Sequence, residues 1–275
     1  MVKIKRWWVQ LTSSLITNSY FEGFFQGRIY KGKFKMACSP GMNCYSCPGA
    51  VSSCPIGALQ AVVGSAKYWY SLYVVGFVGL LGLFLGRWIC GFLCPFGWLQ
   101  EGIYKIKSKK YKIANWIKNI KYVLLVIFVF LIPATVTNVI GLGDPAYCKY
   151  ICPVGMLEGG LPLVFMNKVL QQAIGWLYYW KLTILSMVLL ASVFFYRPFC
   201  KVLCPLGAIY ALFNKVSFYQ YKVDGQKCIQ CKVCSQVCKM DVHMYKTPNH
   251  LECIRCGDCK DACPTKAITS GFKVD

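Results

Sequence analysis

Apolar residues are concentrated in a few long runs that short polar segments separate. The three clearest runs cover residues 69–86, 122–140 and 176–196. Each approaches the roughly 20 residues that an α-helix needs to cross the hydrocarbon core of a bilayer. A fourth run, 7–25, is weaker because Gln10, Asn18 and Glu22 interrupt it. It lacks a small-residue cleavage site and predicts an anchor, not a removed signal peptide. The pattern therefore predicts about four transmembrane helices.

Basic residues give the expected orientation of these helices. Lysines and an arginine precede the first span and lysines follow the second: Lys3, Lys5, Arg6, Lys105, Lys107, Lys109, Lys110 and Lys112. The positive-inside rule places both groups in the cytoplasm, so the C-terminus also lies there after the fourth span. Arg28, Lys31, Lys33 and Lys35 would then lie outside, against the rule. The run 161–174 is too short and polar to span and predicts an interfacial helix.

Composition supports a membrane protein and argues against several other classes. Hydrophobic residues are 56% of the 275 residues, charged residues 15%, and the mean hydropathy is +0.46, which is typical of membrane proteins. The net charge of +21 could indicate nucleic-acid binding. The lysines lie at the ends of apolar runs, however, where they anchor helices, so we expect no nucleic-acid partner. Only His243 and His250 occur, without a CxxCH motif, so we expect no haem.

The chain has eighteen cysteines, and the sharpest motif is a pair of C-terminal runs. These are Cys228-x2-Cys231-x2-Cys234-x3-Cys238 and Cys253-x2-Cys256-x2-Cys259-x3-Cys263-Pro264. In two-cluster ferredoxins three cysteines of each run hold one [4Fe–4S] cluster, and the fourth ligates the other cluster. We therefore expect one cluster on Cys228, Cys231, Cys234 and Cys263, and another on Cys253, Cys256, Cys259 and Cys238. Zinc knuckles use paired CxxC motifs instead. Lys239 replaces the proline usual after the first run, which affects the turn and not the ligands.

A Cys-Pro unit recurs four times between the apolar runs. The four copies begin at Cys54, Cys94, Cys152 and Cys204 and read CPIG, CPFG, CPVG and CPLG. They divide the membrane part into two halves of two spans each, and duplications of this kind often build a site where the halves meet. On the expected cytoplasmic side, Cys90 and Cys94 come from one half, Cys200 and Cys204 from the other. Residues i and i+4 share one face of a helix, so each pair could hold one edge of a cluster. The alternative is that they are buried free thiols.

Six more cysteines fall on the expected outer side: Cys38, Cys44, Cys47, Cys54, Cys148 and Cys152. Six thiolates exceed the needs of one cubane. Either one cluster uses Cys148 and Cys152 with two of the other four, or the block 38–54 holds its own cluster. A disulfide between spare thiols is the structural alternative.

These motifs resemble the membrane ferredoxin-type quinol dehydrogenase subunits associated with periplasmic nitrate reductase, and their polyferredoxin relatives in nitrous-oxide respiration. The resemblance lies in residues 90–95, in residues 200–207 and in both C-terminal runs, and covers roughly residues 70–270. It implies four spans, cytoplasmic clusters, and electron transfer between a quinol pool or flavoprotein and an extracytoplasmic acceptor. The outer cysteines depart from the nitrate subunit, which favours a more general electron conduit.

The sequence therefore predicts an α-helical integral membrane domain over residues 1–216 and a cytoplasmic α+β two-cluster ferredoxin-like domain over residues 217–275. We expect a subunit of the cytoplasmic membrane that passes electrons between a cytoplasmic donor and a quinone, flavoprotein or extracytoplasmic acceptor. Its partners would be other redox subunits: a flavoprotein, ferredoxin or cytochrome. One or two membrane clusters would add to the two of the ferredoxin domain. The alternatives are a quinol dehydrogenase with clusters on one face only, and a redox-sensing or assembly protein.

Overall fold

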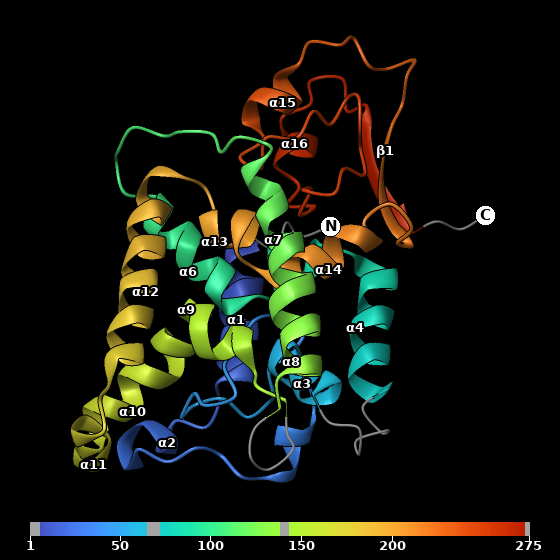
Figure 1. Cartoon of the computed structure of the whole chain (residues 1–275). Helices are drawn as coiled ribbons and strands as arrows, with labels where there is room; N and C mark the ends of the chain where they lie inside the picture. Colours follow the sequence, from blue (N-terminus) through green and yellow to red (C-terminus); the bar gives the residue numbers. More distant parts are fainter. Residues whose placement is uncertain (1–5, 65–71, 138–142, 273–275) are drawn as a thin grey trace.

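A computed structural model describes residues 6–64, 72–137 and 143–272. It is mostly helical, with a helical region (residues 6–216) and a small C-terminal region (residues 217–272) that lies on one end of it (Figure 1). The elements of the helical region are α1 Arg6–Thr17, α2 Glu22–Gln26, η1 Lys33–Met36, α3 Pro55–Val63, α4 Leu72–Leu85, α5 Trp88–Phe92, α6 Pro95–Tyr104, η3 Ile117–Asn119, α7 Ile120–Leu124, η4 Leu125–Leu131, α8 Ile132–Thr135, η5 Tyr147–Ile151, α9 Pro153–Gly155, η6 Met156–Gly160, α10 Leu161–Met166, α11 Lys168–Gln172, α12 Trp176–Phe194, α13 Pro198–Val202 and α14 Pro205–Phe213. Those of the C-terminal region are β1 Tyr219–Val223, α15 Val233–Val237, α16 Asp258–Asp261 and β2 Ile268–Phe272.

Two helical stretches among the described residues are long and apolar enough to cross a membrane. They are Ile117–Thr135, which joins η3, α7, η4 and α8, and α12. Only 28% and 22% of their residues are buried inside the protein, whereas the core helix of a soluble protein would be mostly buried. Their apolar surfaces therefore face outward, as a lipid environment requires. They match the predicted third and fourth spans, although the third begins at Ile117, earlier than predicted.

The first two predicted spans look different. Residues 7–25 do not form one continuous helix, because α1 ends at Thr17 after 12 residues, about 18 Å of helix. The Asn18 side chain bonds back to the Ser14 carbonyl at 3.1 Å, and the Tyr20 N–H donates to the Gly49 carbonyl at 3.1 Å, so the chain turns away. The predicted second span corresponds to α4, which ends at Gly86 in a left-handed conformation (φ 55°). Trp69 and Ile140, at the ends of predicted spans, and Lys3 and Lys5 lie outside the described residues.

The predicted interfacial helix at 161–174 is divided in two. Asn167 separates α10 from α11, and its side chain accepts the Val169 N–H at 3.1 Å. This is an N-cap, which satisfies one of the free donors at the start of a helix. Both short helices expose most of their residues at the end of the helical region opposite the C-terminal region (Figure 1).

The C-terminal region is closed by its two strands. β1 and β2 pair antiparallel, with Tyr219 opposite Phe272 and Val223 opposite Ile268. The pairing joins the two ends of the region, so the cysteine runs between them are held in one compact unit. Arg255 fixes this unit to the helical region, since its guanidinium donates to the Leu85 carbonyl at 2.9 Å and to the Asn214 carbonyl at 2.8 Å.

Candidate iron–sulfur centres

The two C-terminal cysteine runs interleave in space. One cavity is lined by three cysteines of the first run and the last of the second: Cys228, Cys231, Cys234 and Cys263. A second cavity is lined by the complementary set: Cys238, Cys253, Cys256 and Cys259. We call these sets the first and second C-terminal quartets. The fourth cysteine of each run has joined the other set, which is the grouping that two-cluster ferredoxins use.

The backbone of the two runs repeats the same unusual conformation. Left-handed residues occur at matched positions of the runs: Gln230 and Arg255, Lys232 and Gly257, and Asp241 and Lys266. Non-glycine residues seldom adopt this conformation, so its recurrence indicates that both runs wrap around their cavities in the same way. The turn at Asp241 is the same as that at Lys266, although Lys239 stands where a proline is usual. The substitution therefore leaves the turn intact.

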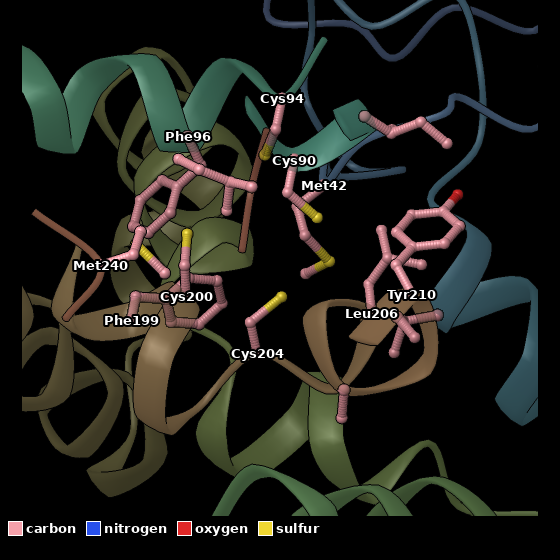
Figure 2. Packing of buried hydrophobic residues seen from close by; sticks show 14 of the residues in the cluster. Met42, Cys90, Cys94, Phe96, Phe199, Cys200, Cys204, Leu206, Tyr210 and Met240 are labelled. Carbon is pink, nitrogen blue, oxygen red and sulfur yellow. The ribbon is translucent and has the colours of Figure 1, made fainter. Parts of the chain in front are cut away.

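Four buried cysteines from the two halves meet below the C-terminal region. They are Cys90, Cys94, Cys200 and Cys204, each 4–8% exposed, and we call them the inner quartet. Figure 2 shows their sulfur atoms directed toward one another, with the rings of Phe96 and Phe199 beside them. Burial and the neighbouring thiols raise the pKa of Cys94 to about 12 and that of Cys204 well above its ordinary value. The four thiols are thus close enough to oppose each other's ionisation, a cost that bound metal ions would remove.

The expectation that each CxxxC pair lies on one helix face is wrong. Cys90 lies on α5, whereas Cys94 is the residue at which α6 begins. Cys200 on α13 and Cys204 before α14 repeat this break. The cause is the following proline, because a residue before proline is restricted to extended backbone, and Cys94 and Cys204 both have it (ψ 115° and 110°). The break turns both sulfurs of each pair inward, which a straight helix would not need.

Each CPxG unit forms the same thiol-binding turn. The proline occupies the first helical position, and the glycine N–H two residues later donates to the cysteine sulfur, as Gly207 does to Cys204 at 3.3 Å. The other three pairs are Gly57 with Cys54, Gly97 with Cys94 and Gly155 with Cys152. The first N–H groups of a helix have no partner within the helix, and they favour a negative charge nearby. The repeated motif thus provides donors for four thiolates.

Two fully buried arginines cross between the halves at the inner quartet. Arg87, three residues before Cys90, donates to the Cys200 carbonyl at 3.2 Å. Arg197, three residues before Cys200, donates to the Cys90 carbonyl. The glycines of the CPxG units make room for them, since a β-carbon on Gly97 would lie 3.1 Å from the Arg197 guanidinium, and one on Gly207 3.5 Å from Arg87. The halves are therefore related by a pseudo-two-fold arrangement around the four cysteines.

The charge of these arginines is only partly balanced by carboxylates. Glu252 pairs with Arg87 at 2.8 Å and also with Lys121, and Glu101 pairs with Arg197 at 3.0 Å and with Arg6 at 2.6 Å. Each carboxylate thus meets two cations. The Nε atoms of Arg87 and Arg197 are buried without a hydrogen-bond partner, and the Arg87 guanidinium also bonds the Cys90 thiol. Unpaired buried donors are rare, so the surroundings suit an anionic group such as a thiolate-ligated iron–sulfur cluster.

A second set of four cysteines surrounds a larger cavity farther from the C-terminal region. Cys44, Cys54, Cys148 and Cys152 all line this cavity of about 680 Å³, and we call them the outer quartet. Cys54 and Cys152 begin α3 and α9, and Cys148 lies on η5. Lys181 of α12 also lines the cavity and donates to the Cys148 carbonyl at 3.1 Å. Here a lysine takes the place that an arginine has at the inner quartet.

Cys38 and Cys47 do not line this cavity. Cys38 pairs as an isolated bridge with Ser53, and the Cys47 thiol donates to the Asn18 side-chain oxygen at 3.5 Å. Of the two alternatives that the sequence left open, the structure groups Cys148 and Cys152 with two cysteines of the block, and these two are Cys44 and Cys54. All eighteen cysteines are free thiols, so the alternative disulfide is not formed.

Two buried glutamines, which the sequence analysis did not identify as functional, bind thiols of the opposite half. Gln60 donates to the Cys148 sulfur at 3.1 Å and accepts the Tyr147 N–H at 2.9 Å. Gln100 donates to the Cys200 sulfur at 3.4 Å and accepts the Phe199 N–H at 3.1 Å. Both stand six residues after the cysteine of a CPxG unit. The signal was present in the sequence, because both repeats end in Leu-Gln.

The second C-terminal quartet lies directly against the inner quartet. A β-carbon on Gly91 would be only 2.5 Å from the Ile254 carbonyl oxygen, so Cys90 and Cys253 belong to neighbouring residues in contact. Arg87 bridges the same junction by donating to the Leu251 carbonyl at 3.0 Å, and Met240, two residues after Cys238, lies beside Cys200 in Figure 2. In the described parts of the chain, no three His, Cys, Asp or Glu side chains stand close enough to hold a single metal ion.

The comparisons with known proteins agree with this reading of the sites. A helical protein with buried four-cysteine sets and ferredoxin spacing belongs to the class of iron–sulfur electron-transfer proteins. A family model described as a 4Fe-4S binding domain matches residues 66–114, 122–169 and 178–221, about half of the chain, and a second 4Fe-4S binding domain model matches residues 247–269. The chain therefore belongs to the ferredoxin-type 4Fe-4S membrane protein family, and the predicted resemblance is confirmed.

Relatives of this chain have similar descriptions. An uncharacterized protein of Methanocaldococcus jannaschii is 29% identical over 70% of this chain and 75% of its own length. The ferredoxin-type protein NapH of Haemophilus influenzae is 26% identical, covering 74% of this chain and 67% of that protein. The methylamine utilization ferredoxin-type protein MauN of Methylorubrum extorquens is 25% identical, covering 86% and 76%. No solved structure matches the chain significantly.

Proposed function

We propose that this protein is a membrane subunit that carries electrons through four [4Fe–4S] clusters, one on each cysteine quartet. The observation that carries the proposal is the spatial order of the quartets. The second C-terminal quartet contacts the inner quartet through Gly91 and Ile254, and the outer quartet lies beyond the inner one along the helices. Bound clusters would supply reversible one-electron oxidation and reduction at each position. The protein would hold them, exclude water and supply hydrogen bonds to their thiolates.

The membrane placement divides the chain in the same direction. The hydrocarbon core is roughly 30 Å thick, too far for one electron jump, so clusters set into the protein near each face would shorten it. Residue 6 and the basic segment 105–112 lie at the same end as the C-terminal region (Figure 1). The positive-inside rule assigns this end to the cytoplasm. Residues 217–275 would then form a cytoplasmic two-cluster ferredoxin domain, with the outer quartet toward the other face.

The residues around the quartets support a role in stabilising negative clusters. The CPxG amides, the two glutamines and the arginines all direct donors to cysteines or their carbonyls. Hydrogen bonds to cluster sulfurs and burial are the means by which proteins set cluster potentials. A different set of donors at each quartet would give each cluster its own potential, which an electron pathway needs.

The outer quartet favours a conduit across the membrane over a quinol dehydrogenase with clusters on one face only. Such an enzyme would not need four buried thiols far from the C-terminal region. The partners we propose are a cytoplasmic donor or acceptor at the ferredoxin domain and a quinone, flavoprotein or extracytoplasmic redox protein at the opposite end.

Iron and sulfide analysis of the full-length protein, purified anaerobically, tests this proposal. Four cubanes give about 16 irons and about 16 inorganic sulfides per chain. The double variant Cys94→Ser with Cys204→Ser should lose about four irons while keeping the EPR signals of the ferredoxin domain. A full iron content in the double variant would mean that the inner quartet is only packing. A reporter fused after Asp275 that is active only outside the cytoplasm would reverse the orientation.

A further inference from the structure

The loop between η1 and α3 passes between the inner and outer quartets. Met42 and Asn43, in the middle of this loop, are 2% and 0% exposed. The Met42 side chain lies beside Cys90 and Cys94 in Figure 2, and Met42 also lines the cavity of the outer quartet. One residue therefore contacts both sites, although nothing in its residue type suggested a functional role.

Successive backbone N–H groups of this loop bind sulfurs of different quartets. The Met42 N–H hydrogen-bonds the thiol of Cys94, which belongs to the inner quartet. The next N–H, of Asn43, hydrogen-bonds the thiol of Cys54, which belongs to the outer quartet. Successive amide nitrogens are at most about 4 Å apart even in extended chain. With one hydrogen bond at each end, the two sulfurs are on the order of 10 Å apart.

The loop is held rigidly in this position. The Tyr210 hydroxyl donates to the Pro40 carbonyl at 3.0 Å, and the Ser39 hydroxyl donates to the Gly41 carbonyl at 2.9 Å. Gly41 lies so close to Cys94 that a β-carbon would be 2.8 Å from the Cys94 α-carbon, so only glycine allows this approach. Contacts from both sides of the loop thus fix the two N–H groups against their sulfurs.

We propose that the Met42–Asn43 backbone is the bridge that couples the inner and outer quartets, with each of its N–H groups adjusting the potential of one cluster. This inference rests on the proposed function. One electron passes between the two quartets in each event, one side being oxidised as the other is reduced, with no bond formed or broken. The bridge keeps the connection short and largely covalent, and its segment lies outside the residues that the family model matches.

EPR spectroscopy of the full-length, dithionite-reduced protein tests the separation without any change to the bridge. Two paramagnetic clusters on the order of 10 Å apart broaden or split each other's signals by spin–spin interaction. The Cys148→Ser variant, which lacks an outer ligand, should therefore show a narrower inner signal than the wild type. An inner signal that is identical in both proteins, while the iron content falls by about four in the variant, would overturn the bridge and leave the proposed function standing. If the wild type holds only about 12 irons and the variant loses none, the outer cluster itself is wrong.

The N–H groups are tested by a matched pair of substitutions at Asn43. Asn43→Pro removes the N–H, whereas Asn43→Ala removes the side chain and keeps the N–H. Because hydrogen bonds to sulfur raise cluster potentials, the outer cluster should become harder to reduce in Asn43→Pro than in Asn43→Ala, while the inner potential stays the same in both. Equal outer potentials in the two variants would refute the role of this N–H. If Asn43→Pro does not fold, the spin–spin comparison above still decides the proposal.

Discussion

Gln100 donates its side-chain amide to the Cys200 sulfur at 3.4 Å, and it comes from the half of the chain opposite to that cysteine. Its oxygen accepts the Phe199 N–H at 3.1 Å, so one side chain fixes both the sulfur and the backbone next to it. Gln60 has the same two contacts with Cys148 and Tyr147. The repeat therefore conserves a cross-half contact in space as well as a cysteine spacing in sequence.

Replacing these glutamines should change one cluster potential each. We expect Gln100→Leu to make the inner cluster harder to reduce, because it removes a hydrogen bond to a ligand sulfur, and Gln60→Leu to do the same only at the outer cluster. Each change also leaves a buried N–H unsatisfied, at a cost of about 1–3 kcal/mol in the free energy of unfolding. Redox titrations followed by EPR measure the potentials. Gln171→Leu, at an exposed glutamine, is the control, and a common shift in all three variants would contradict the assignment.

Arg87 should be needed to hold the C-terminal region in place. Its guanidinium pairs with Glu252 at 2.8 Å, and the two side chains are 0% and 7% exposed. Removing one partner of a buried ion pair commonly costs about 3–5 kcal/mol, because it leaves the other charge uncompensated. We therefore expect Arg87→Leu to expose the segment near residue 217 to limited proteolysis at neutral pH.

The matched control for Arg87 is the exposed pair of Lys227 and Asp224, whose side chains are 67% and 37% exposed. Exposed ion pairs contribute only about 0–1 kcal/mol, so Lys227→Leu should leave the proteolysis rate close to that of the wild type. Equal cleavage rates in the two variants would show that the Arg87 pair does not hold the junction.

Much of the site arrangement followed from spacing, because spacing along the chain limits which cysteines can meet. The interleaving of the C-terminal quartets and the meeting of Cys90, Cys94, Cys200 and Cys204 were both predicted from the runs and the repeat. The choice of Cys44 and Cys54 over Cys38 and Cys47 was not, since all four lie in one irregular loop whose path depends on contacts such as Tyr210 with Pro40.

Helix boundaries near the sites were harder to predict, because local hydrogen bonds and proline override the apolar pattern. The pattern alone suggested one helix over residues 7–25, but the polar contacts of Asn18 end α1 early. It also suggested that CxxxC pairs share one helix face, although the proline after the second cysteine breaks the helix there. In both places the departure from regular structure positions residues around a site.

The outer quartet makes a specific prediction about which cysteines bind iron. Cys44→Ser and Cys54→Ser should each lower the iron content by about four per chain, because both residues line the outer cavity. Cys38→Ser and Cys47→Ser should keep the full content, although these cysteines are just as buried. Iron analysis of the four variants gives the answer. A loss of iron in Cys47→Ser with none in Cys44→Ser would require a different ligand set.

The junction between Gly91 and Ile254 should control electron transfer from the C-terminal region to the inner quartet. A β-carbon at residue 91 would lie 2.5 Å from a backbone carbonyl oxygen, which cannot move aside as a flexible side chain would. Gly91→Ala should therefore separate the two surfaces, and electron transfer should slow while each site keeps its iron. Stopped-flow reduction, in which the C-terminal clusters are reduced first, measures the rate at which the inner signal follows. Gly102→Ala on α6 is the matched control, because nothing lies within 4 Å of its β-carbon position and alanine favours a helix. If both variants transfer electrons at the wild-type rate, electrons do not pass through this contact.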